Sequence, residues 1–221
     1  MFVVNIIIKR QKMLEILQYD FIQNALIAGV LISIAAGIIG SLVVVNKITF
    51  LTGGIAHSSY GGIGLAIYMG IPVLFGATVF AVLTAILIAI ITLKNRTRID
   101  AIIGMMWASG MAIGIIFVDL TPGYNVDLMS YLFGSIIAVS REDLIYMSVL
   151  DVFIISIVVF FYKQILAVSY DSEFASLRGI NVKFFYTLIL ILAALCVVAA
   201  IKAVGLILVI ALLTIPTYLA E

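Results

Sequence analysis

The stretch ITFLTGGIAHSSYGGIGLAIYMGIPVLFGATVFAVLTAILIAIITL (48–93) decides the fold class of this chain, because none of its 46 residues carries a charge at neutral pH with histidine neutral. A membrane-spanning helix needs about 20 mainly apolar residues, so this stretch is too long for one span. Pro72 lies near its middle, and a proline ends or kinks a helix. We therefore predict two transmembrane helices, near 50–70 and 72–93.

The composition of the whole chain indicates the same bilayer environment. Hydrophobic residues make up 65% of the 221 residues, charged residues make up 10%, and the mean hydropathy is +1.34. Soluble domains are about one quarter charged. The formal net charge of +1, without a basic patch, gives no footprint for a nucleic-acid partner. The single cysteine, Cys196, lies in an apolar run and provides no disulfide framework.

Further apolar runs extend the pattern along the chain. The run 128–140 has only 13 residues, which is short for a span, and we predict a re-entrant or broken helix there. We predict an all-α, polytopic transmembrane helical bundle with about seven spans, forming one domain over 1–221. The five remaining spans are expected at 21–46, 101–118, 144–162, 184–201 and 203–220, the last two separated by Lys202.

The distribution of basic residues predicts the orientation of the connections. The segments 94–98 and 163–183 are basic, whereas 121–127 contains no basic residue and has two acids beside or within it, Asp119 and Asp127. Cytoplasmic connections carry an excess of lysine and arginine. We therefore expect 94–98 and 163–183 in the cytoplasm and 121–127 outside.

The motifs of common enzymes are absent from the sequence. No G-x-x-x-x-G-K-[ST] loop occurs to bind a nucleotide, a single histidine excludes H-E-x-x-H, and one cysteine cannot form a zinc cluster. Ser58 and Ser59 flank His57, but adjacent helical residues do not face one another as a triad requires. We predict a conduit or carrier that is not itself an enzyme and holds no cofactor of its own.

Two ionisable residues within the predicted spans are candidates for a transport pathway. His57 is the only histidine, and ionisable groups at membrane depth tend to face a bundle interior or a wet path. Neutral imidazole is also a metal ligand. The alternative is a histidine bonded to a nearby carbonyl without a ligand role. For Asp151, we favour a solvated position near the interface over a place in the pathway.

Small residues surround His57 and recur at helical spacing. Gly53, Gly61 and Gly64 lie three or four residues apart from one another or from His57 along the predicted helix. Small residues let transmembrane helices approach closely, because packing contacts replace the hydrophobic effect within lipid. We interpret the three glycines as packing residues near the pathway.

Four blocks in the right order resemble the membrane permease of metal-type ATP-binding cassette importers, which take up manganese, zinc or iron. The resemblance covers nearly the whole chain from about Phe21. The blocks are ALIAGVLISIAAGIIGSLVVVNKITFLTGGIAHSSYGGIGLAIYMGI (25–71), DLMSYLFGSIIAVS (127–140), DSEFASLRGINV (171–182) and KAVGLILVIALLTIPTYLA (202–220).

The resemblance implies a half-transporter that works as a homodimer in the membrane lipid. Two ATP-binding cassette ATPase subunits would dock underneath, and an extracytoplasmic metal-binding protein would deliver a divalent metal ion as the transported substrate. ATP chemistry would then reside on another chain, which fits the missing nucleotide motif. His57 would contact the ion in the pathway.

The segment 171–182 matches the family's coupling segment, which contacts the ATPase. Phe174, Leu177 and Ile180 recur every three residues, so a short helix would present one apolar stripe to a partner groove. Gly179 has the position of a C-terminal helix glycine. Asp171 begins the segment. A helix lying on lipid headgroups is the alternative interpretation.

Two departures from the family pattern concern the pathway and the chain end. The family often has an aspartate four residues before its histidine, where both side chains share one helix face; here that position is Gly53. The family also continues for one or two helices after the proline block, so we expect the chain, which ends at Glu221, to be truncated at the C-terminus.

Two other transport functions stay open at this point. One is a cassette-type permease for a metal chelate or a vitamin, which would need a wide, aromatic-lined vestibule. The other is an ion-coupled secondary carrier, which places acids near the midplane of interrupted helices, where only Asp151 could serve. The sequence does not identify the metal.

Overall fold

The computed structural model describes residues 18–94, 99–122 and 129–220, and within these ranges all regular structure is helical, which confirms the predicted all-α class. The elements in chain order are α2 (Asp20–Val45), α3 (Thr49–Met69), α4 (Val73–Lys94), α5 (Ile99–Asp119), α6 (Met129–Phe133), the 3₁₀ turn η1 (Ile136–Ala138), α7 (Arg141–Phe160), α8 (Tyr162–Tyr170), α9 (Ser172–Leu177) and α10 (Val182–Leu219).

The charge-free stretch forms two helices, α3 and α4, divided as the sequence predicts. Gly70 ends α3 in the left-handed conformation, with φ at +67°, and the Ile71 N–H donates to the Ala66 carbonyl at 3.0 Å. A left-handed residue commonly closes a helix in this way, and glycine adopts that conformation without a Cβ penalty. Pro72 then precedes the first turn of α4.

Five of the described helices are long and apolar enough to cross a membrane: α2, α4, α5, α7 and α10. The predicted count of seven spans is therefore not confirmed. α3 has 21 residues but falls outside this group, because its glycines, hydroxyl side chains and His57 reduce its hydropathy. The other difference lies in α10, which covers both of the last two predicted spans.

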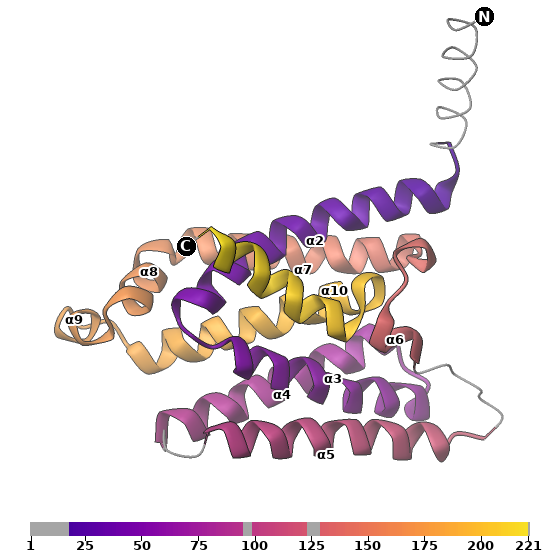
Figure 1. Ribbon diagram of the computed structural model, residues 1–221, viewed down its shortest axis with the longest axis horizontal. Helices are drawn as coiled ribbons and strands as arrows, with labels where there is room; N and C mark the ends of the chain where they lie inside the picture. The colour runs from indigo at the N-terminus through magenta and orange to yellow at the C-terminus, as the bar shows by residue number, and fades with distance from the viewer. Residues whose placement is uncertain (1–17, 95–98, 123–128, 221) are drawn as a thin grey trace, which may run out of the picture.

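The boundary between those two predicted spans lies at Gly205, not at Lys202. Gly205 has φ +79° and ψ 161°, which interrupts the 38-residue α10. Figure 1 shows the segment 206–219, drawn in yellow, running back toward the end of the bundle that holds α8 and α9. Lys202 remains helical, so its charge does not mark the turn; the conformational freedom of Gly205 does.

The segment 129–140 is a broken helix, as its length predicts. α6 ends at Phe133, Gly134 has a φ of +70°, and η1 follows at Ile136. Ser140 then caps α7 in a capping box with Asp143. Leu128, the first residue of the predicted segment, lies outside the described residues.

The helices form two groups on either side of α10 (Figure 1). α3 packs against α4 and α5 in one group, α2 packs against α7 in the other, and α10 contacts both groups. Fifteen of the 21 residues of α3 are buried, a run that includes Ile55, His57 and Ile63. α3 is therefore enclosed by the other helices, which keeps its polar side chains away from lipid.

Candidate functional site

His57 lies midway along α3, inside the bundle. Its side chain is 7% exposed, and its Nδ1 atom has no hydrogen-bond partner. The imidazole stacks on the indole of Trp107 from α5, with ring centroids 3.8 Å apart and planes 12° from parallel. The alternative that the sequence left open, a histidine bonded to a nearby carbonyl, receives no support at Nδ1. A buried ring nitrogen without a partner is available to a ligand.

The seam between α3 and α5 is built from glycines. A Cβ at Gly64 would overlap the Gly114 carbonyl oxygen, and a Cβ at Gly61 would lie 2.9 Å from the Gly110 carbonyl oxygen. Backbone atoms cannot rotate away as side chains do, so these positions require glycine. Such contacts bring two helix backbones closer than larger residues allow.

Gly53 has a different environment from the other two predicted packing glycines. A Cβ at this position would meet only the Ile210 Cδ1 atom, at 3.6 Å, which is ordinary van der Waals contact. Close packing therefore does not account for glycine here. Gly53 lies one turn before His57, and a side chain at 53 has room at its first carbon.

The segment 171–182, predicted to be the coupling segment, forms α9 and the turn after it. Asp171 caps the helix: its Oδ1 accepts from the Glu173 and Phe174 N–H groups at 3.1 and 2.9 Å. Gly179 closes it with φ +76°, and the Ile180 N–H donates to the Ala175 carbonyl at 3.0 Å. Both residues have the helix-end positions that their types favour.

The apolar stripe predicted for this segment is shorter than expected. Phe174 is 50% exposed and Leu177 is 88% exposed, so both project from the bundle. Ile180 is partly buried and packs against the core, because the turn at Gly179 directs the chain back toward it. The outward-facing apolar residues of α9 are therefore Phe174 and Leu177.

A cavity of about 780 Å³ lies at the same end of the bundle, between the start of α3 and the α8–α9 connection. Its lining includes Lys47, Asp100, Ser169 and Tyr170. The Asn46 amide donates to the Ser169 hydroxyl at 2.8 Å, which joins the α2–α3 turn to α8. The cavity therefore lies between the start of the helix that carries His57 and the segment that leads into α9, and this one polar contact ties the end of α2 to α8.

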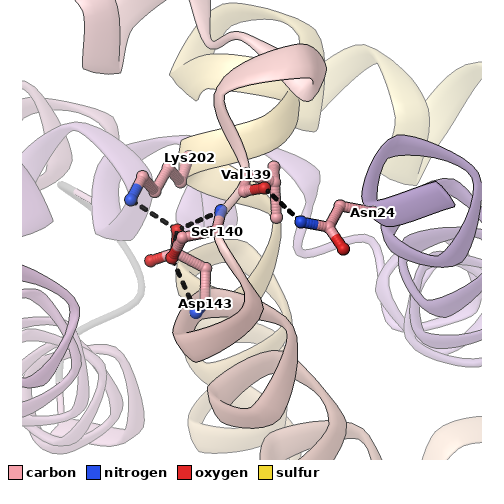
Figure 2. Close-up of polar contacts among 5 residues, drawn as sticks. All are labelled: Asn24, Val139, Ser140, Asp143 and Lys202. Carbon is pink, nitrogen blue, oxygen red and sulfur yellow. Dashed lines mark hydrogen bonds and ion pairs between the residues drawn. The ribbon is translucent and has the colours of Figure 1, made fainter. Parts of the chain in front are cut away.

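A second polar cluster fastens the broken helix 129–140 to α7 and α10 (Figure 2). The Asp143 Oδ2 atom accepts from the Ser140 N–H at 2.8 Å and from the Lys202 Nζ at 2.5 Å. The Asn24 amide of α2 donates to the Val139 carbonyl at 3.2 Å. The side chains of Lys202 and Asp143 are 30% and 11% exposed, so this ion pair is largely shielded from solvent.

The same cluster lies beside a contact between two glycines with positive φ. A Cβ on Gly134 would overlap the Gly205 nitrogen, and a Cβ on Gly205 would overlap the Phe133 carbonyl carbon. The Ser135 N–H donates to the Lys202 carbonyl at 3.0 Å. The break in the short helix and the break in α10 therefore touch backbone to backbone.

Asp151 lies midway along α7 and is only 3% exposed, with no hydrogen-bond partner for its Oδ2 atom. The solvated position near the interface that the sequence suggests is therefore wrong. α7 begins at Arg141, which places Asp151 near its middle, where α2 and α10 pack against it.

Sequence reasoning missed three participants in these sites: Trp107, Lys202 and Asp143. The stack on His57 joins residues 50 positions apart, and the ion pair joins residues 59 positions apart. Only the rarity of lysine and tryptophan in so apolar a chain could have drawn attention to them. Among the described residues, no three His, Cys, Asp or Glu side chains meet in a group that could hold a metal ion.

Comparison with known proteins relates this architecture to membrane transport components. The chain is 46% identical to an uncharacterized membrane protein of Synechocystis over 95% of this chain and 75% of that protein. It is 33% identical to the manganese transport system membrane protein MntC of Listeria monocytogenes, over 91% of this chain and 71% of that protein. The chain thus spans about three quarters of the length of these relatives.

A solved structure and a family model agree with these relatives. The structure of PsaBC from Streptococcus pneumoniae in complex with Fab matches with a TM-score of 0.82 and 31% identity, over 93% of this chain and 74% of that one. The model of the ABC 3 transport family matches residues 18–221. On this evidence the chain is an integral membrane protein that belongs to the ABC 3 transport family.

Proposed function

We propose that the chain is the permease subunit of an ATP-binding cassette importer that carries a divalent transition metal ion across the plasma membrane. The observation that carries the proposal is His57: a buried imidazole whose Nδ1 has no partner, at the centre of the most enclosed long helix. Manganese is named for the Listeria relative, and zinc and iron are the other candidates. The metal is cargo, and the chain holds no cofactor.

Two copies of the chain would form one pathway. A transition-metal ion takes four or more ligands, and His57 is the only histidine in the sequence. A homodimer supplies a second His57, with the remaining ligands coming from water or from the ion's carrier. In this arrangement α3 and the segment 182–204 of α10 would cross the membrane with α2, α4, α5 and α7, and the segment 206–219 would supply most of a seventh span.

ATP hydrolysis would take place on a separate ATPase docked against α9. The exposed side chains of Phe174 and Leu177 form an apolar surface on an otherwise polar connection, and Arg178 lies over the Phe174 ring at 5.0 Å. A partner groove that buries both apolar side chains would remove them from water. An extracytoplasmic metal-binding protein would dock at the opposite end, near the segment 129–140.

We expect Leu177→Asp and Phe174→Asp to abolish recovery of the ATPase when the chain is purified with it. A carboxylate in an apolar groove would be desolvated without a partner, which costs several kcal/mol, on the order of a hundredfold or more in affinity. The measurement is the amount of ATPase bound per permease chain. Lys183→Asp, outside α9, is the matched control and should retain the ATPase.

The same experiment separates the two transporter classes. An ion-coupled secondary carrier, which the buried Asp151 would favour, recovers no ATPase with any variant. If Leu177→Asp and the unmodified chain recover equal amounts of ATPase, α9 is not the docking surface, while the importer assignment remains intact.

We expect His57→Ala to reduce metal uptake by the assembled importer at least roughly tenfold, since even outer-shell partners of metal ligands contribute about 10- to 100-fold. The assay is ATP-dependent uptake of Mn²⁺, Zn²⁺ or Fe²⁺ into proteoliposomes. Gly53→Asp is the complementary change: it places a carboxylate one turn from His57, where the first carbon of the side chain has room, and should strengthen ion binding. Unchanged uptake with His57→Ala would contradict the proposed role.

A further inference from the structure

Trp107 covers one face of the His57 imidazole, and the α3–α5 seam determines that contact. Gly110 lies one turn after Trp107, and a Cβ there would be 2.5 Å from the Ser58 Cα atom. The Ser58 hydroxyl donates to the Met106 carbonyl at 2.9 Å. Both contacts fix the register of the two helices at the residues adjoining the ring pair, so the stack follows from backbone packing.

The stack restricts the imidazole without occupying its nitrogens. With planes 12° from parallel and centroids 3.8 Å apart, the indole lies flat against one face of the ring. A metal ion binds a ring nitrogen in the plane of the imidazole, at the ring edge. Stacking therefore leaves the coordinating edge free while it limits rotation of the ring. Hydrogen bonds often perform this task for metal-binding histidines, and the Nδ1 of His57 has none.

We propose that Trp107 is a positioning residue for the metal ion: its indole fixes the plane of the His57 imidazole, in place of a hydrogen bond. This inference rests on the proposed function of His57. If the ring is already restricted before the ion binds, less conformational entropy is lost on binding. Preorganisation of this kind raises the affinity for the ion. The interaction free energy of an aromatic pair predicts that loss of the stack raises the dissociation constant for the metal ion about two- to tenfold.

The first test compares Mn²⁺ affinity of the purified full chain in detergent, measured by electron paramagnetic resonance of the free ion. Trp107→Leu should weaken binding about two- to tenfold, and Trp107→Phe, which keeps an aromatic face, should restore most of it. Phe117→Leu is the matched control. It removes a second aromatic pair between the same two helices, Tyr68 with Phe117 at 5.3 Å, and should leave the affinity unchanged.

The second test takes its main readout from the chain with Trp107 and His57 both in place. Trp107 is the only tryptophan, so a chain labelled with 5-fluorotryptophan gives one ¹⁹F resonance from the stack itself. Substoichiometric Mn²⁺ should broaden this resonance, because paramagnetic broadening acts over short distances, and His57→Ala should abolish the effect.

The outcomes distinguish this inference from the function on which it rests. Equal Mn²⁺ affinity for Trp107→Leu and the unmodified chain, with His57→Ala binding weakly, overturns the positioning role alone. Mn²⁺ binding that leaves the ¹⁹F resonance sharp also overturns it. If His57→Ala binds Mn²⁺ as tightly as the unmodified chain, the role of His57 fails, and the positioning role fails with it.

Discussion

Replacing Gly205 with alanine should prevent the chain from reaching its native fold or lower its melting temperature by about 5–10 °C. Two effects add at this position. The backbone has φ +79° and ψ 161°, a region that is essentially restricted to glycine and costs another residue about 1–3 kcal/mol. The new Cβ would also overlap the Phe133 carbonyl carbon and lie 2.5 Å from the Gly134 nitrogen.

The steric overlap at Gly205 cannot be removed by rotating a side chain. Its neighbours are backbone atoms of the broken helix, so either the turn of α10 or the segment around Gly134 must move. Overpacking of this kind typically costs about 1–3 kcal/mol. The melting temperature of the purified chain in detergent, followed by the emission of its single tryptophan, is the measurement.

Two matched glycines separate the conformational effect from the steric one. Gly179 has φ +76° but no heavy atom within 4 Å of the position that a Cβ would take, so Gly179→Ala should show the cost of a positive φ without a steric overlap. Gly37 has the same open space within the regular helix α2, where alanine should be neutral or stabilising by about 0.5–1 kcal/mol. If Gly205→Ala and Gly179→Ala lower the melting temperature equally, the backbone contact at Gly134 contributes nothing.

Replacing Lys202 with methionine should destabilise the chain by about 3 kcal/mol, because it leaves the shielded Asp143 carboxylate without its counterion. The Asp143 side chain is 11% exposed, and its remaining hydrogen-bond partners belong to Ser140. We expect the melting temperature to fall and the segment 129–140 to exchange amide hydrogens faster, since Lys202 and Asp143 fasten it to α10 and α7.

A second change should reverse part of this loss. In Lys202→Met with Asp143→Asn, the uncompensated charge is gone while the amide oxygen can still accept from the Ser140 N–H, so stability should recover relative to Lys202→Met alone. Arg141→Met is the matched control: it breaks an ion pair with Asp20 of 3.0 Å whose side chains are both 74% exposed, and it should cost less than about 1 kcal/mol. If Lys202→Met and Arg141→Met reduce the stability of the chain equally, shielding from solvent does not strengthen the Lys202–Asp143 ion pair.

The division of the chain into helices can be predicted from the sequence because it depends on local properties. The uncharged stretch 48–93 and Pro72 specify two helices, and the short run 128–140 specifies a broken one. The helix-end position of Gly179 follows from residue type. Each of these depends on hydropathy, chain length or backbone preference within a few residues.

The turn in α10 and the depth of Asp151 cannot be predicted in the same way. A charge is costly within lipid, so the local sequence points to Lys202 as the boundary between two spans. The ion pair with Asp143, 59 residues away along the chain, instead allows Lys202 to remain within the helix. The short distance along the chain from Asp143 to Asp151 points to the interface. The burial of Asp151 depends instead on α2 and α10, which the local sequence does not specify.

The sequence by itself determined that this chain is a helical membrane protein, where its helices lie within a few residues, and that His57 is its only histidine, since hydropathy and composition act locally. Tertiary structure alone decided which glycines require close packing, that Gly53 leaves room for a Cβ atom, and that Trp107 stacks on His57. The physical reason is that these properties depend on the distance and register between helix backbones, which arise only when residues far apart in the chain pack together.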